Sequence, residues 1–165
     1  MTVDPRYAWN GRSPPLILAL TGGGFRGYFT ALVLAEIEKL IGAPCCRVFN
    51  LIAGTSIGGI IAIGLAFGIP ARTIADRIAE RGPSIFPPLR LKRARRLLGP
   101  PYASEPIEQV LRGLLGKRVD GPLGAAPQNV MVVTASPGTA KMEVLSSWDA
   151  HRTAAISVQD AALAT

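Results

Sequence analysis

Two glycine-rich segments contain the residues whose types and spacing suit covalent chemistry. The second, Gly54-Thr55-Ser56-Ile57-Gly58, has the G-x-S-x-G spacing of a nucleophile elbow, a tight strand-to-helix turn that projects a serine hydroxyl. Its glycines lack the Cβ atoms that would clash in such a turn. The helix expected from Ile57 onward points free N–H groups and the positive end of its dipole at Ser56. The segment therefore predicts that Ser56 is a catalytic nucleophile for an acyl carbonyl.

The first segment contains Gly22, Gly23, Gly24 and Gly27, with Arg26 between the last two glycines. A tetrahedral intermediate of acyl transfer needs preorganised donors around its oxyanion. A run of glycines lets backbone amides approach one oxygen without obstruction by side chains. We therefore expect this segment to form the oxyanion hole that serves Ser56.

The first segment also fits the G-x-G-x-x-G fingerprint of a dinucleotide-binding turn, because it follows the apolar run 16–20. That fingerprint expects an acidic residue near the end of the second strand. The candidate second strand, residues 48–53, contains none. The order and context of the two segments favour the hydrolase interpretation, and dinucleotide binding stays an alternative.

Residues 21–28 and 52–59 resemble the two signature blocks of the patatin-like phospholipases, serine acyl hydrolases that use a Ser-Asp dyad. The resemblance implies that the glycine-rich block provides the oxyanion hole, that Arg26 supports this loop, and that Ser56 attacks a phospholipid ester. The implied reaction needs no metal or organic cofactor. Together with residues 101–106, the blocks are most similar to bacterial patatin-like effectors of nucleotide-activated anti-phage systems, which implies a nucleotide activator as a partner.

The family's catalytic aspartate comes late, in an Asp-Gly-Gly or Asp-Gly-Ala motif that follows an alanine-rich segment. Residues 160–165 resemble the start of that segment, and the sequence stops there. We therefore expect residues 1–165 to be a patatin-like catalytic domain that is C-terminally incomplete and lacks the aspartate. The alternative is a non-catalytic, truncated module that binds lipid or a partner.

A Ser-His-Asp triad inside this chain would have to use His151, the single histidine, with Asp120 or Asp149 as the orienting acid. The order Ser, Asp, His suits an α/β-hydrolase, but Asp149 lies only two residues from His151. The elbow also follows a single strand-helix unit, which suits the patatin arrangement better. Asp120 precedes Gly121 and Pro122, a combination that predicts a turn residue.

The elements that must position these residues alternate between strands and helices. This order predicts an α/β fold with a mainly parallel sheet and helices on both faces, with both glycine-rich turns at the same end of the sheet. Apolar runs predict strands at 16–20, 48–53, 129–135 and 142–147. Helical spacing predicts helices at 30–41, 57–69, 70–80 and 105–115, with Gly82 and Pro83 ending the third of these. The run 57–69 is too short for a membrane span and predicts a buried helix.

Composition agrees with a folded enzyme domain, since 48% of the 165 residues are hydrophobic. The sequence does not open with a charged start followed by an apolar region, which favours the cytoplasm over export. The adjacent residues Cys45 and Cys46 have poor geometry for a mutual disulfide, and no metal-binding spacing surrounds them. We expect ordinary reduced thiols and no metal site.

The formal net charge is +7, and basic residues gather between positions 90 and 96, namely Arg90, Lys92, Arg93, Arg95 and Arg96. Such a basic cluster attracts anions. It suits peripheral binding to an anionic membrane at the inner face, where each basic residue contributes about 1 kcal/mol. A nucleotide activator and a solvated loop without a ligand are alternatives. No nucleic acid is expected, because aromatic residues are not interleaved with the charges.

Overall fold

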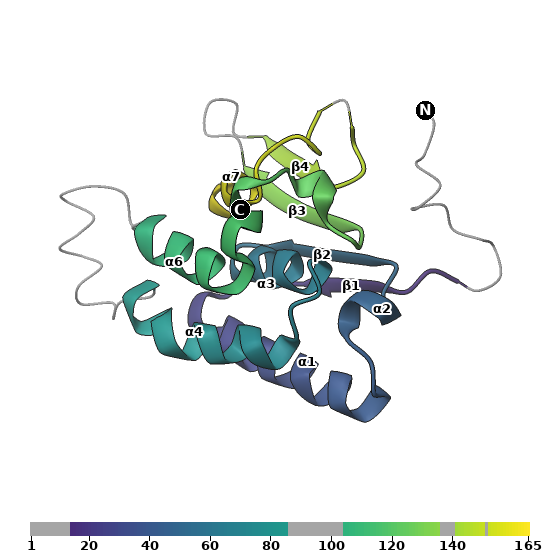
Figure 1. The fold of residues 1–165 in the computed structure, drawn as a ribbon, viewed down its shortest axis with the longest axis vertical. Coiled ribbons are helices and arrows are strands. Elements are labelled where there is room, and N and C mark those ends of the chain that lie inside the picture. Colours follow the sequence, from purple (N-terminus) through teal and green to yellow (C-terminus); the bar gives the residue numbers. More distant parts are fainter. Residues whose placement is uncertain (1–13, 86–103, 136–140, 151) are drawn as a thin grey trace.

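The computed structural model describes residues 14–85, 104–135, 141–150 and 152–165. Its sheet has the strand order β1 (Ile17–Leu20), β2 (Leu51–Thr55), β3 (Val130–Ala135) and β4 (Met142–Ser146). The first three strands run parallel, and β4 pairs antiparallel with β3 (Figure 1). The prediction of a mainly parallel α/β sheet is confirmed. The basic cluster 90–96 and His151 lie outside the described residues.

Helix α3 (Ile57–Ala66) is the centre of the fold, and all ten of its residues are buried. It packs against the sheet face that presents Leu20, Ile52 and Val132. A helix that is apolar all round must be covered on every side. The sequence prediction of a buried helix in this region is therefore confirmed.

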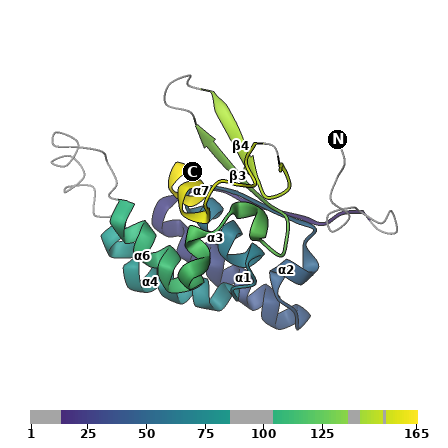
Figure 2. The same cartoon turned by 45° about the horizontal axis from the view of Figure 1, so that its top comes forward.

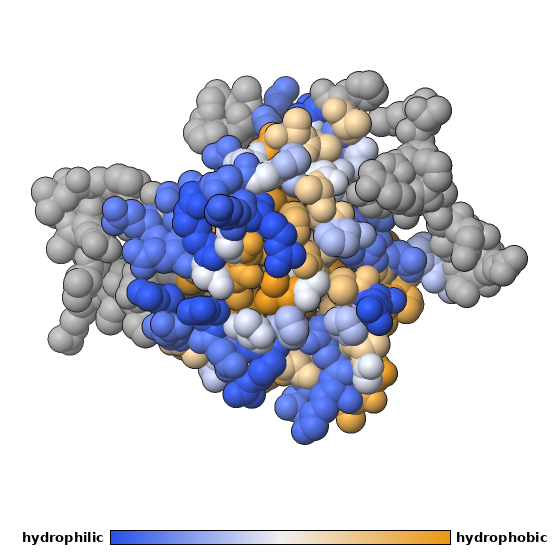
Figure 3. All heavy atoms as spheres, in the orientation of Figure 1, coloured by the Kyte–Doolittle hydropathy of each residue, from blue (hydrophilic) through white to orange (hydrophobic). Residues whose placement is uncertain are grey.

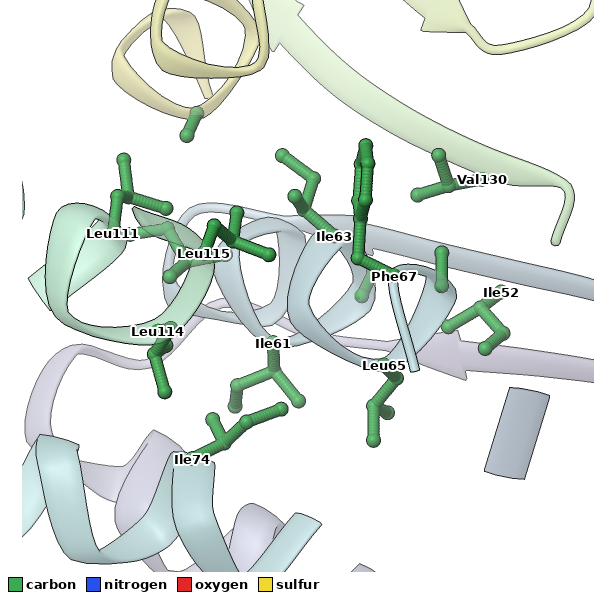
Figure 4. Packing of buried hydrophobic residues seen from close by; sticks show 14 of the residues in the cluster. Ile52, Ile61, Ile63, Leu65, Phe67, Ile74, Leu111, Leu114, Leu115 and Val130 are labelled. Atoms are coloured by element: carbon green, nitrogen blue, oxygen red, sulfur yellow. The ribbon is translucent and has the colours of Figure 1, made fainter. Parts of the chain in front are cut away.

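A second helical layer covers the side of α3 that faces away from the sheet. It consists of α1 (Gly27–Ile41), α4 (Ala71–Ile85) and α6 (Ser104–Leu115). Figure 4 shows Ile61 on the side of α3 that faces Ile74 of α4, with Leu114 of α6 close to both. In the space-filling view, hydrophobic atoms show in the middle of the molecule between hydrophilic side chains (Figure 3).

The described helices lie mainly on one side of the sheet, whereas helices on both faces were expected (Figures 1 and 2). On the opposite face of the described sheet, Ile17 is 57% exposed and Val144 is 45% exposed. In the described part of the chain, no helix combines the length and apolarity needed to cross a membrane.

Four predicted boundaries are wrong by three residues or more. Helix α1 begins at Gly27 rather than at residue 30, and α3 ends at Ala66 rather than at residue 69. Val48 ends the short helix α2 (Cys45–Val48), so β2 begins at Leu51 rather than at residue 48. Helix α4 continues past Gly82 and Pro83 to Ile85. A Cβ at Gly82 would collide with the ring of Phe25, so that ring packs directly on the helix backbone. This tertiary contact outweighs the local tendency of Gly-Pro to end a helix.

Glu38 of α1 holds the starts of two other helices. One of its carboxylate oxygens accepts a hydrogen bond from the backbone N–H of Cys45, at the start of α2, at 2.8 Å. The other accepts from the N–H of Ala71, at the start of α4, also at 2.8 Å. A carboxylate satisfies the free N–H groups and favours the positive end of each helix dipole. Burial and the neighbouring Glu38 raise the pKa of the Cys45 thiol to about 12, so this thiol stays protonated.

Four short elements complete the described chain. Two 3-10 turns, η3 (Gly116–Asp120) and η4 (Leu123–Ala125), connect α6 to β3. A third, η2 (Gly24–Arg26), precedes α1. Helix α7 (Val158–Ala164) follows β4 and returns to β3, where its last residues lie beside the elbow.

Candidate active site

The two glycine-rich segments meet at the carboxyl ends of β1 and β2. Leu20 of β1 pairs with Gly54 of β2 in the parallel ladder, so the turns that follow both strands leave the same edge of the sheet. A Cβ built on Gly22 would lie 3.1 Å from the Cβ of Ser56. The backbone of the first segment therefore passes directly beside the candidate nucleophile.

Ser56 has a strained backbone, with φ 53° and ψ −132°. In the described residues, it is the one residue other than glycine that has a positive φ. Such strain costs about 1 to 3 kcal/mol and persists where the surroundings enforce it, often at functional sites. Ser56 is exposed and stands at the N-cap of α3, but its side chain makes no capping hydrogen bond. The hydroxyl is therefore available to a substrate.

The elbow depends on close backbone contacts that side chains would prevent. A Cβ at Gly54 would collide with the carbonyl oxygen of Gly58, and a Cβ at Gly58 would lie 2.5 Å from the carbonyl oxygen of Leu20. A Cβ at Gly27 would collide with the side chain of Ile57, which is buried. The chain can therefore reverse at Ser56 while the start of α1 packs on the start of α3.

The candidate oxyanion loop, residues 22–24, turns sharply into η2. Gly24 has φ 58°, a conformation that favours glycine. The backbone N–H of Arg26 donates to the carbonyl oxygen of Gly23 at 3.2 Å, and the Arg26 side chain folds back towards the same oxygen, with Nε at 3.5 Å. Arg26 thus closes the loop from within, as the family resemblance implies.

A hollow of about 490 Å³ opens beside the elbow, at the carboxyl ends of β2 and β3. Its lining combines three hydroxyl-bearing residues with four apolar ones: Thr55, Thr134 and Thr165, and Val133, Ala135, Met142 and Ala164. The Thr55 hydroxyl donates to the carbonyl oxygen of Val133 at 3.2 Å, which joins the elbow to β3. The hollow thus offers both hydroxyl groups and apolar surface beside the elbow that carries Ser56.

The candidate acids of a triad are not brought to Ser56. Both carboxylate oxygens of Asp120, at the end of η3, accept hydrogen bonds from the Arg112 guanidinium, at 2.8 and 3.1 Å. This pairing lowers the pKa of Asp120 below its ordinary value. Asp149 lies in the turn after β4. Within the described ranges, no cluster of three or more His, Cys, Asp or Glu side chains could hold a metal ion.

One contact of the elbow was not predicted from the sequence. The hydroxyl oxygen of Thr165 accepts a hydrogen bond from the backbone N–H of Ser56 at 2.8 Å. The two residues are 109 positions apart, and no local pattern links them. The sequence signal closest to this contact is Gly59, the small residue on α3 against which Thr165 packs.

The family model for patatin-like phospholipases matches residues 18–165. The chain belongs to the patatin-like phospholipase family. The assignment agrees with a serine at the elbow and a glycine-rich loop beside it. It favours the hydrolase interpretation of the first segment over the dinucleotide-binding alternative.

Relatives within the patatin-like phospholipases include bacterial and plant proteins. The chain is 36% identical to a cGAMP-activated phospholipase of Vibrio cholerae, over 90% of this chain and 46% of the relative. It is 40% identical to a cGAMP-activated phospholipase of Pseudomonas aeruginosa, over 76% of this chain and 37% of the relative. It is 32% identical to patatin-like protein 2 of Arabidopsis thaliana, over 81% of this chain and 37% of the relative. The chain thus spans less than half the length of these curated relatives.

The space around Gly54, in the elbow, and around Gly113, inside α6, predicts opposite effects on stability when each glycine is replaced by alanine. Gly54→Ala should lower the free energy of unfolding by about 2 kcal/mol or more, because the new Cβ collides with the Gly58 backbone. Gly113→Ala, inside α6, should raise it by about 0.5 to 1 kcal/mol, because its Cβ meets no atom closer than 3.4 Å. Urea unfolding followed by circular dichroism measures both. Equal stability of the two variants would contradict the proposed packing of the elbow.

Proposed function

We propose that this chain supplies the nucleophile and the oxyanion loop of a serine acyl hydrolase that cleaves fatty acyl esters of membrane phospholipids. The observation that carries the proposal is the exposed, strained Ser56 at the start of α3 with the backbone of Gly22 beside it. A strained serine at a strand-to-helix turn is the arrangement that α/β acyl hydrolases use. Membership of the patatin-like phospholipase family supports the same chemistry.

In the proposed reaction, Ser56 Oγ attacks the ester carbonyl carbon and loses its proton to a base. The carbonyl oxygen becomes an oxyanion that the backbone amides of residues 22–24 and the start of α3 stabilise. Collapse of the tetrahedral intermediate expels the lysophospholipid alcohol, which takes up a proton. Water then attacks the acyl-serine ester and releases the fatty acid, so that Ser56 is regenerated.

The base in this proposal is an aspartate from outside the 165 residues. Among the described residues, the hydroxyl of Ser56 has no hydrogen bond to a carboxylate, whereas its backbone N–H is engaged by Thr165. The chain spans 37% to 46% of the curated relatives named above, and the family resemblance places the dyad aspartate late. In this proposal, residues 1–165 contribute the nucleophile and the oxyanion loop, and the aspartate comes from elsewhere in the catalytic domain.

The hollow beside the elbow supports a substrate with an apolar chain. Val133, Ala135 and Met142 offer apolar surface there, and Met142 is 75% exposed. Burial of each methylene of an acyl chain contributes about 0.8 kcal/mol. In the proposed complex, the acyl chain lies in the hollow while its carbonyl group reaches Ser56.

Regulation by a nucleotide and contact with a membrane belong to the same proposal. The relatives from Vibrio cholerae and Pseudomonas aeruginosa are cGAMP-activated phospholipases, which supports a nucleotide activator here. The basic cluster 90–96 supports peripheral contact with the anionic inner face of the membrane. The free thiols of Cys45 and Cys46 agree with a cytoplasmic site.

An activity-based probe tests the proposed nucleophile. A fluorophosphonate should label the 165-residue chain at Ser56, slowly because the base is absent, and Ser56→Ala should remove the label. Ser157→Ala, which changes a serine at the far end of α7, should keep it. Peptide mass spectrometry locates the label. A folded chain that is never labelled would instead support the non-catalytic module that binds lipid or a partner.

Neutralising the basic cluster tests the two anionic partners. Replacement of Arg90, Lys92, Arg93, Arg95 and Arg96 by glutamine should abolish sedimentation with phosphatidylglycerol vesicles, because each charge contributes about 1 kcal/mol of binding. Vesicles of neutral phosphatidylcholine are the control. Unchanged binding to the anionic vesicles would exclude the cluster as the membrane contact. A cyclic dinucleotide that raises the melting temperature of the original chain, and not of the variant, would assign the cluster to the nucleotide.

A further inference from the structure

The backbone N–H of Ser56 has an unusual partner. At the end of β2 the chain leaves the sheet, and α3 begins only with Ile57, so neither element supplies a backbone acceptor for this N–H. The hydroxyl oxygen of Thr165 accepts it at 2.8 Å. The bond gives this backbone donor an acceptor that neither β2 nor α3 supplies. The contact therefore stabilises the strained conformation of Ser56.

The Thr165 hydroxyl is itself fixed by β3. Its hydrogen is donated to the carbonyl oxygen of Val133 at 2.6 Å, the same oxygen that accepts from the Thr55 hydroxyl. One residue earlier, the carbonyl oxygen of Ala164 accepts from the Thr134 hydroxyl. A hydroxyl group can accept a hydrogen bond from the Ser56 N–H and at the same time donate one to the Val133 carbonyl oxygen. An aliphatic side chain of the same shape can form neither bond. These bonds tie the end of α7 to both the sheet and the elbow.

Gly59 makes room for this arrangement. A Cβ at Gly59 would lie 2.8 Å from Thr165 Cγ2 and 3.1 Å from its hydroxyl oxygen. Gly59 lies outside the G-x-S-x-G spacing, so the elbow turn itself does not explain this glycine. The approach of the Thr165 side chain to the first turn of α3 does explain it.

We propose that Thr165 is a positioning residue for the reaction, acting through the backbone of Ser56. Its hydroxyl holds the Ser56 N–H and so keeps the Oγ atom directed at the carbonyl group of the substrate. The role in catalysis rests on the proposed hydrolase function. The hydrogen-bonded link from β3 through Thr165 to Ser56 rests on the geometry alone, and the two can be measured separately.

Amide hydrogen exchange of the 165-residue chain tests the link without any activity. In Thr165→Val, which keeps the shape and removes the hydroxyl, the Ser56 amide should exchange faster by about tenfold or more. Thr165→Ser should restore slow exchange. Ser157→Ala is the matched control, because it removes the N-cap of α7, where Ser157 Oγ accepts from Asp160 N–H at 3.0 Å, and leaves Thr165 unchanged.

Faster exchange in Thr165→Val alone supports the link. Unchanged exchange in that variant overturns it, and so does equal acceleration in Ser157→Ala, because general loosening of α7 would then explain the result.

Labelling kinetics with the fluorophosphonate test the catalytic role. Thr165→Val should lower the maximal labelling rate by about tenfold and leave the half-saturating probe concentration unchanged, because the loss concerns orientation of the nucleophile. Thr165→Ser should recover the rate. A rate that stays unchanged while exchange accelerates overturns the positioning role. If the original chain is not labelled at all, the proposed hydrolase function fails for this chain. The exchange rates then still show whether the hydrogen-bonded link from Thr165 to Ser56 exists.

Discussion

The turn between β2 and α3 forces Ser56 into a backbone conformation that residues with a side chain adopt rarely. Such a conformation survives only if the surrounding structure makes every relaxed alternative worse. Three constraints act on it together: the ladder that fixes β2, the buried helix that starts at Ile57, and the hydroxyl of Thr165. The exposed hydroxyl of Ser56 is the outcome of these constraints, because each one fixes the backbone and none of them forms a hydrogen bond with the hydroxyl.

Burial of α3 restricts movement at the start of this helix. The helix lies between the sheet and the outer layer of α1, α4 and α6, so it cannot shift without opening the core. The outer layer is itself held at Glu38, whose carboxylate caps the starts of α2 and α4. Preorganised donors contribute to catalysis because they need no rearrangement when charge develops. A start of α3 that is fixed in this way suits such a role.

The sequence predicts those parts of the site that depend on local geometry. The spacing of Gly54, Ser56 and Gly58 predicts the turn because only glycine tolerates the backbone contacts that the turn requires. The parallel strands follow from short apolar runs, and their shared direction places both glycine-rich turns at one edge. The predicted start of β2 at residue 48 is too early, because Val48 is the last residue of α2. The apolar run in the sequence does not distinguish this helical residue from the strand residues that follow.

Long-range contacts lie beyond such reasoning. Gly82 and Pro83 carry a strong local signal for a helix end, but the Phe25 ring packs on the helix and the signal is overridden. The bond between Thr165 and Ser56 joins residues that share no pattern, and it depends on the path of α7 back to β3. The pairing of Asp120 with Arg112 likewise depends on how η3 folds against α6.

In the proposed enzyme, the glycine loop and Ser56 form one acyl-transfer site. A crystal structure of the chain with a phosphonate covalently bound to Ser56 tests it most directly, because the phosphoryl oxygen stands in for the oxyanion of the tetrahedral intermediate. This oxygen should accept hydrogen bonds from backbone amides of residues 22–24, at about 2.7 to 3.1 Å. A phosphoryl oxygen that points away from the loop, into solvent or towards β4, would contradict it.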